Sequence, residues 1–405
     1  MMVLTNRNRK AMKVVRKLAA YGFLAAAACV ACGCGESDRR AGVDVQGEVE
    51  GFDATRMVIS RVANQPYDQL VPLDTVSVES GHFAWRCDTL GCDVYALTFI
   101  TDAELNDNSV YALLGDGRVT MKVVRSAQGG LEPHSQGSAM QSRYEDFIAG
   151  YRKAGRQAEI DSVEQEFYAA RNRNDTVTMA AIKESSRELY SDGAAQVEKY
   201  VKEQMADSSR DFFTFFLYYM FEVVPKSIVR QGQIDTINQQ LLEWKGAEVQ
   251  SSRLMRDARE RIAIASRSVE GALAPELVCV DPQGDTLRLS ELRGRRVLID
   301  FWASYCSWCR LEMPTLRKAY EQYADAKGVT FLSVSIDKSR DAWLRAVEEE
   351  GMPWKNALVT EAQAATVTTD YNITGIPLIL LLDEEGRIVR RGLRGEEISE
   401  VLAAL

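Results

Sequence analysis

The chain has 405 residues, of which 46% are hydrophobic and 26% are charged, values that are ordinary for a globular protein and exclude general disorder. The formal net charge is −9, although basic residues crowd into the first 17 positions, so the remainder is strongly acidic. This charge balance excludes nucleic acid as an expected partner, because phosphate binding requires a basic stripe. The two histidines, His82 and His134, lie far apart in the sequence. We therefore expect neither a histidine-based metal site nor a cofactor.

Residues 1–34 have the order of an export signal. A basic stretch is followed by a short apolar run, AAYGFLAAAACVAC, which is too short to predict a spanning helix. Cys29, Cys32 and Cys34 then lie among Ala and Gly just before a polar stretch. The segment resembles a bacterial lipoprotein signal, in which one such cysteine carries the lipid and anchors the protein to the membrane. The alternative is a cleaved secretory signal, and either interpretation places the mature chain in the cell envelope, facing the periplasm, or outside the cell.

The sequence after the signal segment predicts a β-region, a linker and a helical region. Residues 43–125 contain short runs rich in Val, Thr and aromatic residues, several of which alternate with period two, and they predict an antiparallel β-sandwich or barrel. Residues 126–139 are dense in Gly, Ser and Gln and predict a linker. Residues 140–268 show apolar positions at helical spacing and predict a helical region. Within it, the aromatic run at 211–225 indicates either a buried core helix or an exposed surface that binds a partner.

Residues 270–405 predict an α/β domain. LVCVD and DTLRLS flank a PQG turn and indicate a hairpin, and RRVLIDFWA and VTFLSVSID indicate buried strands that are each followed by a helix. PLILLLDEEGRIVRRG indicates a strand pair, and EEISEVLAAL a closing helix. The expected architecture is therefore multidomain α+β, with a β-sandwich, a helical middle region and a C-terminal α/β domain.

The sequence FWASYCSWCRLEMP contains two cysteines, Cys306 and Cys309, at the junction of a strand and a helix. Spacing of three on a helix places both sulfur atoms on one face, within reach of a disulfide. At a helix N-terminus, unpaired N–H groups and the helix dipole favour a thiolate. We expect Cys306 to be the nucleophile and Cys309 the more buried thiol that releases the mixed disulfide.

The sequence Asp-Phe-Trp-Ala-x-x-Cys-x-x-Cys, followed by Glu-Met-Pro and later by Gly-Ile-Pro, resembles the thioredoxin superfamily. The resemblance is greatest to extracytoplasmic members of the TlpA/ResA-like group and covers about residues 270–405. It implies a thioredoxin-like fold and thiol–disulfide oxidoreductase activity. It also implies that Asp300 and Glu312 handle protons, although each could instead be a structural carboxylate.

The resemblance assigns further residues around the disulfide. Pro377 matches the cis-proline that faces the two cysteines, and the backbone of Ile376 would then pair with an extended substrate segment. Trp302, Tyr305 and Trp308 should frame the disulfide and contact the substrate. Members of the group act mostly as reductants that draw electrons from a membrane-bound donor, so the implied partners are client proteins with thiols or disulfides and such a donor.

Three alternatives remain for the C-terminal domain. A structural zinc site would need a second ligand pair, which Cys87, Cys92 and Cys279 do not offer in one domain. A thiol peroxidase would have Pro-x-x-x-Thr-x-x-Cys, and no such pattern occurs near Cys306. A client-binding lipoprotein with an inactive thioredoxin domain is disfavoured by the intact cysteine pair. Cys87 and Cys92 flank a turn and form either a disulfide or two thiols, whereas Cys279 should pack as a small apolar residue.

Overall fold

The computed structural model describes residues 42–405 except 63–69, 102–108, 116, 127–129 and 225–227. The predicted signal segment with Cys29, Cys32 and Cys34 lies outside the described residues. The chain divides into two compact units, one of residues up to 226 with 241–258, the other of 227–240 with 259–405. No helix in the described ranges is long and apolar enough to cross a membrane.

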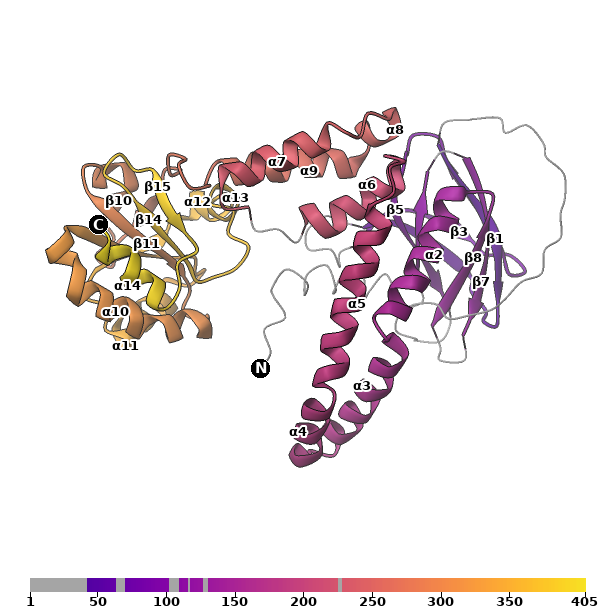
Figure 1. Cartoon of the computed structure of the whole chain (residues 1–405), viewed down its shortest axis with the longest axis horizontal. Coiled ribbons are helices and arrows are strands. Elements are labelled where there is room, and N and C mark those ends of the chain that lie inside the picture. Colours follow the sequence, from indigo (N-terminus) through magenta and orange to yellow (C-terminus); the bar gives the residue numbers. More distant parts are fainter. Residues whose placement is uncertain (1–41, 63–69, 102–108, 116, 127–129, 225–227) are drawn as a thin grey trace. The chain divides into compact units, whose positions relative to one another are not determined.

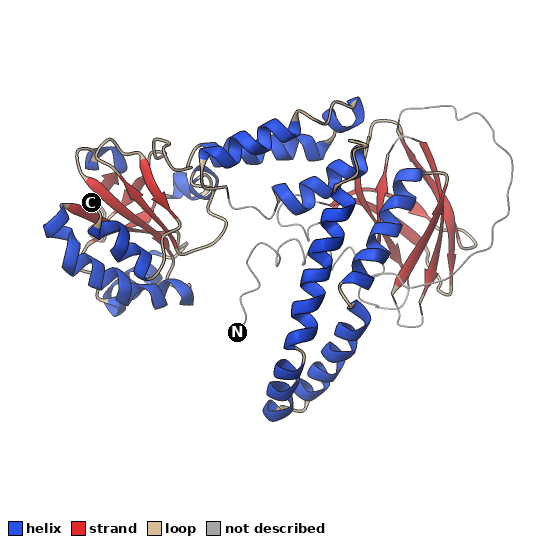
Figure 2. Ribbon diagram, viewed as in Figure 1, coloured by secondary structure: helices blue, strands red, loops and turns tan. Residues whose placement is uncertain are grey.

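The first unit begins with two four-stranded sheets (Figures 1 and 2). One sheet has the order β4-β1-β7-β8 and the other β3-β2-β5-β6. Side chains of both sheets share one core, in which Phe83 of the first sheet meets Phe99 of the second at 5.4 Å between ring centroids. The strands are β1 (Val43–Glu50), β2 (Arg56–Val62), β3 (Leu70–Ser77), β4 (His82–Cys87), β5 (Asp93–Ile100), β6 (Ser109–Leu114), β7 (Gly117–Arg125) and β8 (Leu131–Gln136). The predicted sandwich is thus present.

Two details of this β-region differ from the sequence prediction. β1 pairs with β7 in parallel, whereas the other pairs within both sheets are antiparallel. The chain changes sheets between β6 and β7, and this crossing sets the direction in which β7 meets β1. The sequence could not predict that direction, because alternation of apolar residues indicates only which face of a strand is buried. The predicted linker at 126–139 contains β8, which pairs with β7 through six residues. Its Gly and Ser content suggested a loop, but Leu131 is fully buried in the sandwich core.

Helices complete the first unit. α2 packs on β6 and β8, and the buried amide of Gln141 accepts a hydrogen bond from the backbone N–H of Leu113 at 2.7 Å. The sandwich and most of the helical region are therefore one compact body. The helices are α2 (Ala139–Ala154), α3 (Gln157–Asn172), α4 (Thr176–Ser185), α5 (Arg187–Met205), α6 (Phe212–Tyr218), the π-helix η1 (Tyr219–Val223) and α8 (Ala247–Gln250). α7 (Gln231–Leu241) belongs to the second unit except for its last residue, and α9 (Arg253–Ser266) is divided between the two units after residue 258.

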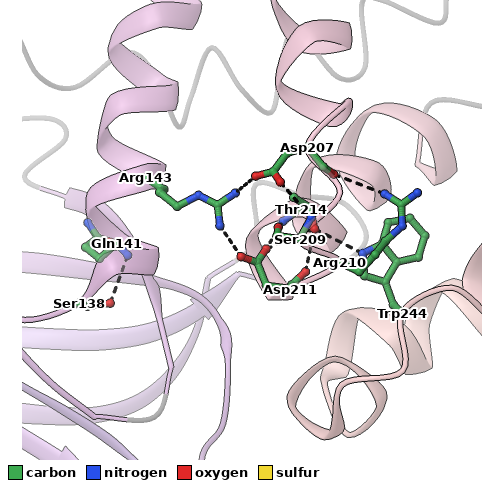
Figure 3. A network of polar contacts seen from close by, with 9 residues as sticks. All are labelled: Ser138, Gln141, Arg143, Asp207, Ser209, Arg210, Asp211, Thr214 and Trp244. Carbon is green, nitrogen blue, oxygen red and sulfur yellow. Dashed lines mark hydrogen bonds and ion pairs between the residues drawn. The ribbon is translucent and has the colours of Figure 1, made fainter. Parts of the chain in front are cut away.

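Residues 212–223 of the aromatic run form α6 and η1, and every residue of α6 is buried. This supports the core interpretation and excludes an exposed partner surface on α6. Figure 3 shows the polar network beside it, in which Arg143 of α2 reaches Asp207 and Asp211. Asp211 also caps α6, because its side chain accepts from the backbone N–H of Thr214 at 3.0 Å.

α3 and α4 form a helical hairpin that reaches away from the sandwich within this unit (Figure 1). α4 has no buried residue. The connection between the helices contains Asn174 with φ of 56°, and Asp175 caps α4 by accepting from Thr178 N–H at 3.0 Å. The hairpin is therefore held by local capping more than by burial.

The second unit has a seven-stranded sheet with the order β10-β9-β13-β12-β11-β14-β15. The neighbours β11, β12 and β13 are parallel, whereas β14 runs antiparallel to β11. Helices and loops cover both faces, giving two cores. Its elements are β9 (Val278–Val280), β10 (Thr286–Arg288), the 3-10 helix η2 (Leu289–Leu292), β11 (Arg296–Trp302), α10 (Ser307–Lys327), β12 (Val329–Ser335), α11 (Arg340–Glu350), β13 (Lys355–Val359), α12 (Glu361–Ala364), α13 (Val367–Asp370), β14 (Leu378–Leu382), β15 (Ile388–Arg391) and α14 (Glu396–Ala403).

The central strand β11 sends alternate side chains to opposite faces. Val297, Ile299 and Phe301 enter one core, and Leu298 and Trp302 enter the other, which also contains Cys309. Asp300 lies between Leu298 and Trp302 in this alternation, so it points to the face of the sheet that α10 covers.

Candidate active site

Cys306 and Cys309 lie where β11 ends and α10 begins, and they are joined by a disulfide. Cys306 is the N-cap of α10, and its sulfur accepts from the backbone N–H of Cys309 at 3.1 Å. Cys306 is 9% exposed and Cys309 is fully buried. Of the two cysteines, only Cys306 keeps a small exposed fraction, and the helix N-terminus stabilises negative charge at its sulfur.

The loop before Cys306 is fixed by hydrogen bonds. Asp337, just after β12, accepts from Ser304 through both the backbone N–H at 2.8 Å and the hydroxyl at 2.7 Å. The Ser335 hydroxyl donates to the same carboxylate at 2.7 Å. On the opposite side, Arg310 donates to the Ser304 carbonyl at 3.0 Å. This clamp holds the first turn of α10 at the carboxyl end of the parallel strands.

The loop before β14 faces the disulfide. The peptide bond between Ile376 and Pro377 is cis, and the Ile376 carbonyl oxygen lies 3.7 Å from the Cys306 sulfur. Both residues thus lie where the sequence interpretation expected them.

Asp300 is buried on the central strand below α10. One carboxylate oxygen accepts from the Ser333 hydroxyl at 3.2 Å, and Ser333 in turn accepts from the Trp354 indole at 2.9 Å. The other oxygen, Oδ1, is buried and has no hydrogen-bond partner within the described residues. Burial raises the pKa of Asp300 to about 7; Ser333 and Arg394 oppose this rise and Glu312 adds to it. A carboxyl group with this pKa can exchange a proton near neutral pH.

Glu312 lies one turn after Cys309 on α10. Its carboxylate accepts from the backbone N–H of Gly395 at 2.8 Å, at the N-terminus of α14. Gly395 has φ of 52° and ψ of −131°, a conformation that favours glycine. Glu312 therefore joins α10 to α14 and also influences the charge of Asp300.

The aromatic residues divide into two groups. Tyr305 and Trp308, to which the resemblance assigned a substrate contact, are 73% and 63% exposed on either side of Cys306 and Ser307 in the chain. Leu311, 69% exposed one turn further along α10, had not been identified from the sequence. Trp302 differs from the prediction: it is fully buried in the core that contains both cysteines, so it supports the disulfide from below and cannot reach a client.

The remaining cysteines are separate from this site. Cys87 and Cys92 are thiols and are not joined by a disulfide. Cys279 is fully buried, and burial raises its pKa to about 12. It packs as a small apolar residue against Leu277 and Val359 in the second core of its domain. Within the described ranges, no group of three or more His, Cys, Asp or Glu residues is arranged to hold a metal ion.

Comparison with known families decides the identity of this domain, since the Redoxin family model matches residues 269–405. The C-terminal domain is a thioredoxin-like thiol–disulfide oxidoreductase domain. This Redoxin domain is 29% identical over 121 residues to the thiol–disulfide oxidoreductase ResA of Bacillus subtilis, covering 30% of this chain and 65% of the relative. The ResA protein of Bacillus thuringiensis is 28% identical over 132 residues, which is 33% of this chain and 73% of that protein.

Solved structures are also similar to the Redoxin domain. The thioredoxin domain of a thiol–disulfide oxidoreductase from Bacteroides vulgatus is 37% identical, with a TM-score of 0.33, and covers 34% of this chain and 96% of that one. A thiol:disulfide interchange protein from a Bacteroides species is 36% identical, with a TM-score of 0.33, covering 34% of this chain and 91% of that one. The chain spans just under two thirds of the length of the Bacillus subtilis relative.

Proposed function

We propose that the whole protein is an extracytoplasmic thiol–disulfide oxidoreductase that reduces disulfides in client proteins through Cys306 and Cys309. The observation that carries the proposal is the asymmetry of the pair. Cys306, at the N-terminus of α10, is 9% exposed, whereas Cys309 is fully buried. An exchanging dithiol needs this arrangement, with one sulfur that meets the client and a second that meets only the first.

The reaction begins with both cysteines reduced. The Cys306 thiolate attacks one sulfur of a client disulfide, so a mixed disulfide forms and the other client sulfur leaves as a thiolate that takes up a proton. Cys309 then loses its proton and attacks the Cys306 sulfur. The second client thiolate leaves, the client has gained two electrons and two protons, and the Cys306–Cys309 disulfide must be reduced again by an external dithiol donor.

The neighbouring groups support this sequence. The exposed rings of Tyr305 and Trp308 and the Ile376 backbone would hold the client segment beside Cys306. Asp300 would accept the Cys309 proton, because its carboxyl group lies on the face that α10 covers and has a pKa of about 7. Glu312 is proposed to assist in proton transfer.

The signal at residues 1–34 supports a place in the cell envelope, facing the periplasm and anchored by a lipid on Cys29, Cys32 or Cys34. A membrane-bound electron donor would fit that location. Radiolabelled palmitate tests the anchor, because label should enter the wild-type chain and be lost when the lipidated cysteine becomes serine.

The reduction potential of the Cys306–Cys309 pair tests the proposed direction. The purified soluble part would be equilibrated in dithiothreitol or glutathione buffers and its thiols trapped, with the Cys306→Ser, Cys309→Ser double variant as control. A value near ~−270 mV supports a reductase, and one near ~−120 mV indicates an oxidant that installs disulfides. Absence of any reversible two-electron couple would reject the oxidoreductase function and favour a client-binding role.

A further inference from the structure

Arg394 lies in the loop between β15 and α14, next to the active site, in a stretch that carries no recognisable motif. The loop is anchored to the sheet, because the N–H groups of Gly392 and Leu393 donate to the Ile379 carbonyl at 2.8 and 3.3 Å. Leu393 is 1% exposed in the core that contains the two cysteines. The backbone before Arg394 is therefore fixed, and its side chain leaves from a defined position.

The guanidinium of Arg394 reaches the loop that faces the disulfide. One of its nitrogens, Nη2, donates to the carbonyl of Pro377, and Nη1 donates to the Leu393 carbonyl at 2.7 Å. Pro377 directly follows Ile376, whose own carbonyl lies 3.7 Å from the Cys306 sulfur. Arg394 is thus one residue removed from the backbone group that touches the reactive sulfur.

The same guanidinium interacts with both carboxylates of the site. Its positive charge lowers the pKa of Asp300, against the larger effect of burial and against the negative charge of Glu312. Burial lowers the pKa of Arg394, and the carboxylates of Glu312, Asp300 and Glu397 oppose that change. Glu312 is held nearby by Gly395, the residue that follows Arg394. One short loop therefore contacts the cis-proline segment and the helical glutamate, and the charge of its arginine acts on the buried acid.

We propose that Arg394 is a positioning residue for thiol–disulfide exchange, which fixes the cis-proline loop against Cys306 and brings a positive charge to the start of β14, the strand that pairs with Asp300. The inference rests on the proposed function. In the release step the proton of Cys309 passes to Asp300, the resulting thiolate bonds to the Cys306 sulfur, and the client sulfur leaves with the bonding electrons. Without a cation beside it, Asp300 would hold its proton to higher pH and accept the Cys309 proton less readily.

The test uses Arg394→Met in the full chain, with Arg394→Lys as a conservative variant that keeps the charge. Arg390→Met is the matched control, because Arg390 is exposed and its side chain donates only to the adjacent Val389 carbonyl at 2.9 Å. The rate of reduction of oxidised glutathione by each reduced protein is followed from pH 5 to 9. Thermal unfolding monitored by circular dichroism shows that each variant is folded.

We expect the pH midpoint of the rate to rise by about one unit in Arg394→Met, which lowers the rate below the midpoint about tenfold. Arg394→Lys should recover most of this change, and Arg390→Met should match the wild type. A profile of folded Arg394→Met that superimposes on that of the wild type would overturn the proposal.

A second readout separates this inference from the proposed function. In the Cys306→Ser, Cys309→Ser background no exchange occurs, yet the Asp300 carboxyl can be followed by difference infrared spectroscopy, with Asp300→Asn identifying its band. The titration midpoint should rise when Arg394→Met is added. A midpoint that stays in place refutes the role of Arg394. Absence of disulfide reduction by the wild-type chain refutes the oxidoreductase function and leaves the titration of Asp300 unaffected.

Discussion

At the scale of single residues, Asp300 is costly to bury as a carboxylate, and its position suits it to proton transfer. Its carboxyl group is 2% exposed, and one oxygen has no partner within the described part of the chain. A buried carboxylate is expensive unless it is paired, so such a residue on a central strand is more easily explained by reaction chemistry than by folding. The nearby Arg394 and Ser333 offset only part of the effect of burial.

Replacement of Asp300 by Asn should therefore have opposite effects on stability and on activity. The pKa of Asp300 is raised from 3.8 to about 7, so the folded state binds this proton more tightly than the unfolded state. The contribution of this group to the free energy of unfolding is fully present below pH 3.8 and is lost as the pH rises toward 7. This contribution is at most roughly 4 kcal/mol. We would measure the free energy of unfolding in urea at pH 4 and pH 8. Relative to the wild type, the value for Asp300→Asn should be higher at pH 8 than at pH 4.

The same variant should lose the pH dependence of the release step, since Asn cannot accept a proton. Single-turnover reduction of oxidised glutathione should rise through about pH 7 in the wild type and be slower and flat in Asp300→Asn over that range. A new carboxylate at Asn356→Asp should not restore the lost pH dependence, because Asn356 lies on β13 and Asp300 on β11. An unchanged pH profile would remove Asp300 from the mechanism.

The two sulfurs should also behave differently toward clients. Cys309→Ser leaves the accessible Cys306 without its partner, so mixed disulfides should accumulate and survive non-reducing electrophoresis. Cys306→Ser leaves only the fully buried Cys309, and it should trap almost no client. Equal trapping by both variants would contradict the proposed division of roles.

At the scale of elements, helices, strands and turns that depend on local sequence patterns were predicted from the sequence. The junction of β11 and α10, the hairpin of β9 and β10 and the closing helix α14 were all expected from strand periodicity, the turn residues and the cysteine spacing. The parallel pairing of β1 with β7 was not, because strand direction depends on how the chain crosses between sheets. β8 was assigned to a linker on its composition, although Leu131 belongs to the sandwich core.

The residues of the site also divide into those that a local motif locates and those that only the folded chain brings together. Cys306, Cys309 and Pro377 could be located from motif and resemblance, since each lies at a fixed offset in the sequence. Arg394 could not, because its role depends on a loop 17 residues beyond Pro377 folding back onto it. Trp302 was expected from the resemblance to contact a client, but alternation along β11 turns its side chain into the core.

The network in Figure 3 gives a test of how the helices are held together. Arg143 bridges Asp207 and the α6 cap Asp211 and stacks on the Phe213 ring at 4.5 Å. Arg143→Met should lower the free energy of unfolding by about 1–3 kcal/mol, because it removes the ion pairs and leaves a half-buried carboxylate unbalanced. Arg187→Met is the matched control, since Arg187 pairs only with exposed Glu184 and should cost at most about 0.5 kcal/mol. If urea titration gave the same loss in free energy of unfolding for Arg143→Met and Arg187→Met, the network would contribute nothing beyond an exposed ion pair.

At the scale of the whole molecule, the chain forms two units, each with its own core. Arg143 belongs to the first unit and Asp300 to the second. Separate cores are expected to unfold as separate cooperative transitions. Most of the helical region belongs with the sandwich in the first unit, whereas residues 227–240 and 259–405, which include the Redoxin domain, form the second.

Differential scanning calorimetry should therefore resolve two components at neutral pH. Arg143→Met should lower the midpoint of one component, and Asp300→Asn should raise the midpoint of the other. A single transition that both substitutions move together would show that the two units unfold cooperatively.

The hairpin of α3 and α4 has a practical use in engineering the protein. Its tip is stabilised by the Asp175 cap and by no buried side chain of α4, and the connection turns at Asn174. Exposed turns of this kind accept inserted sequence with little loss of stability. An affinity tag or a fluorescent reporter inserted between Arg173 and Asn174 would leave Asp175 in place to cap α4, and both ends of the chain would stay unaltered.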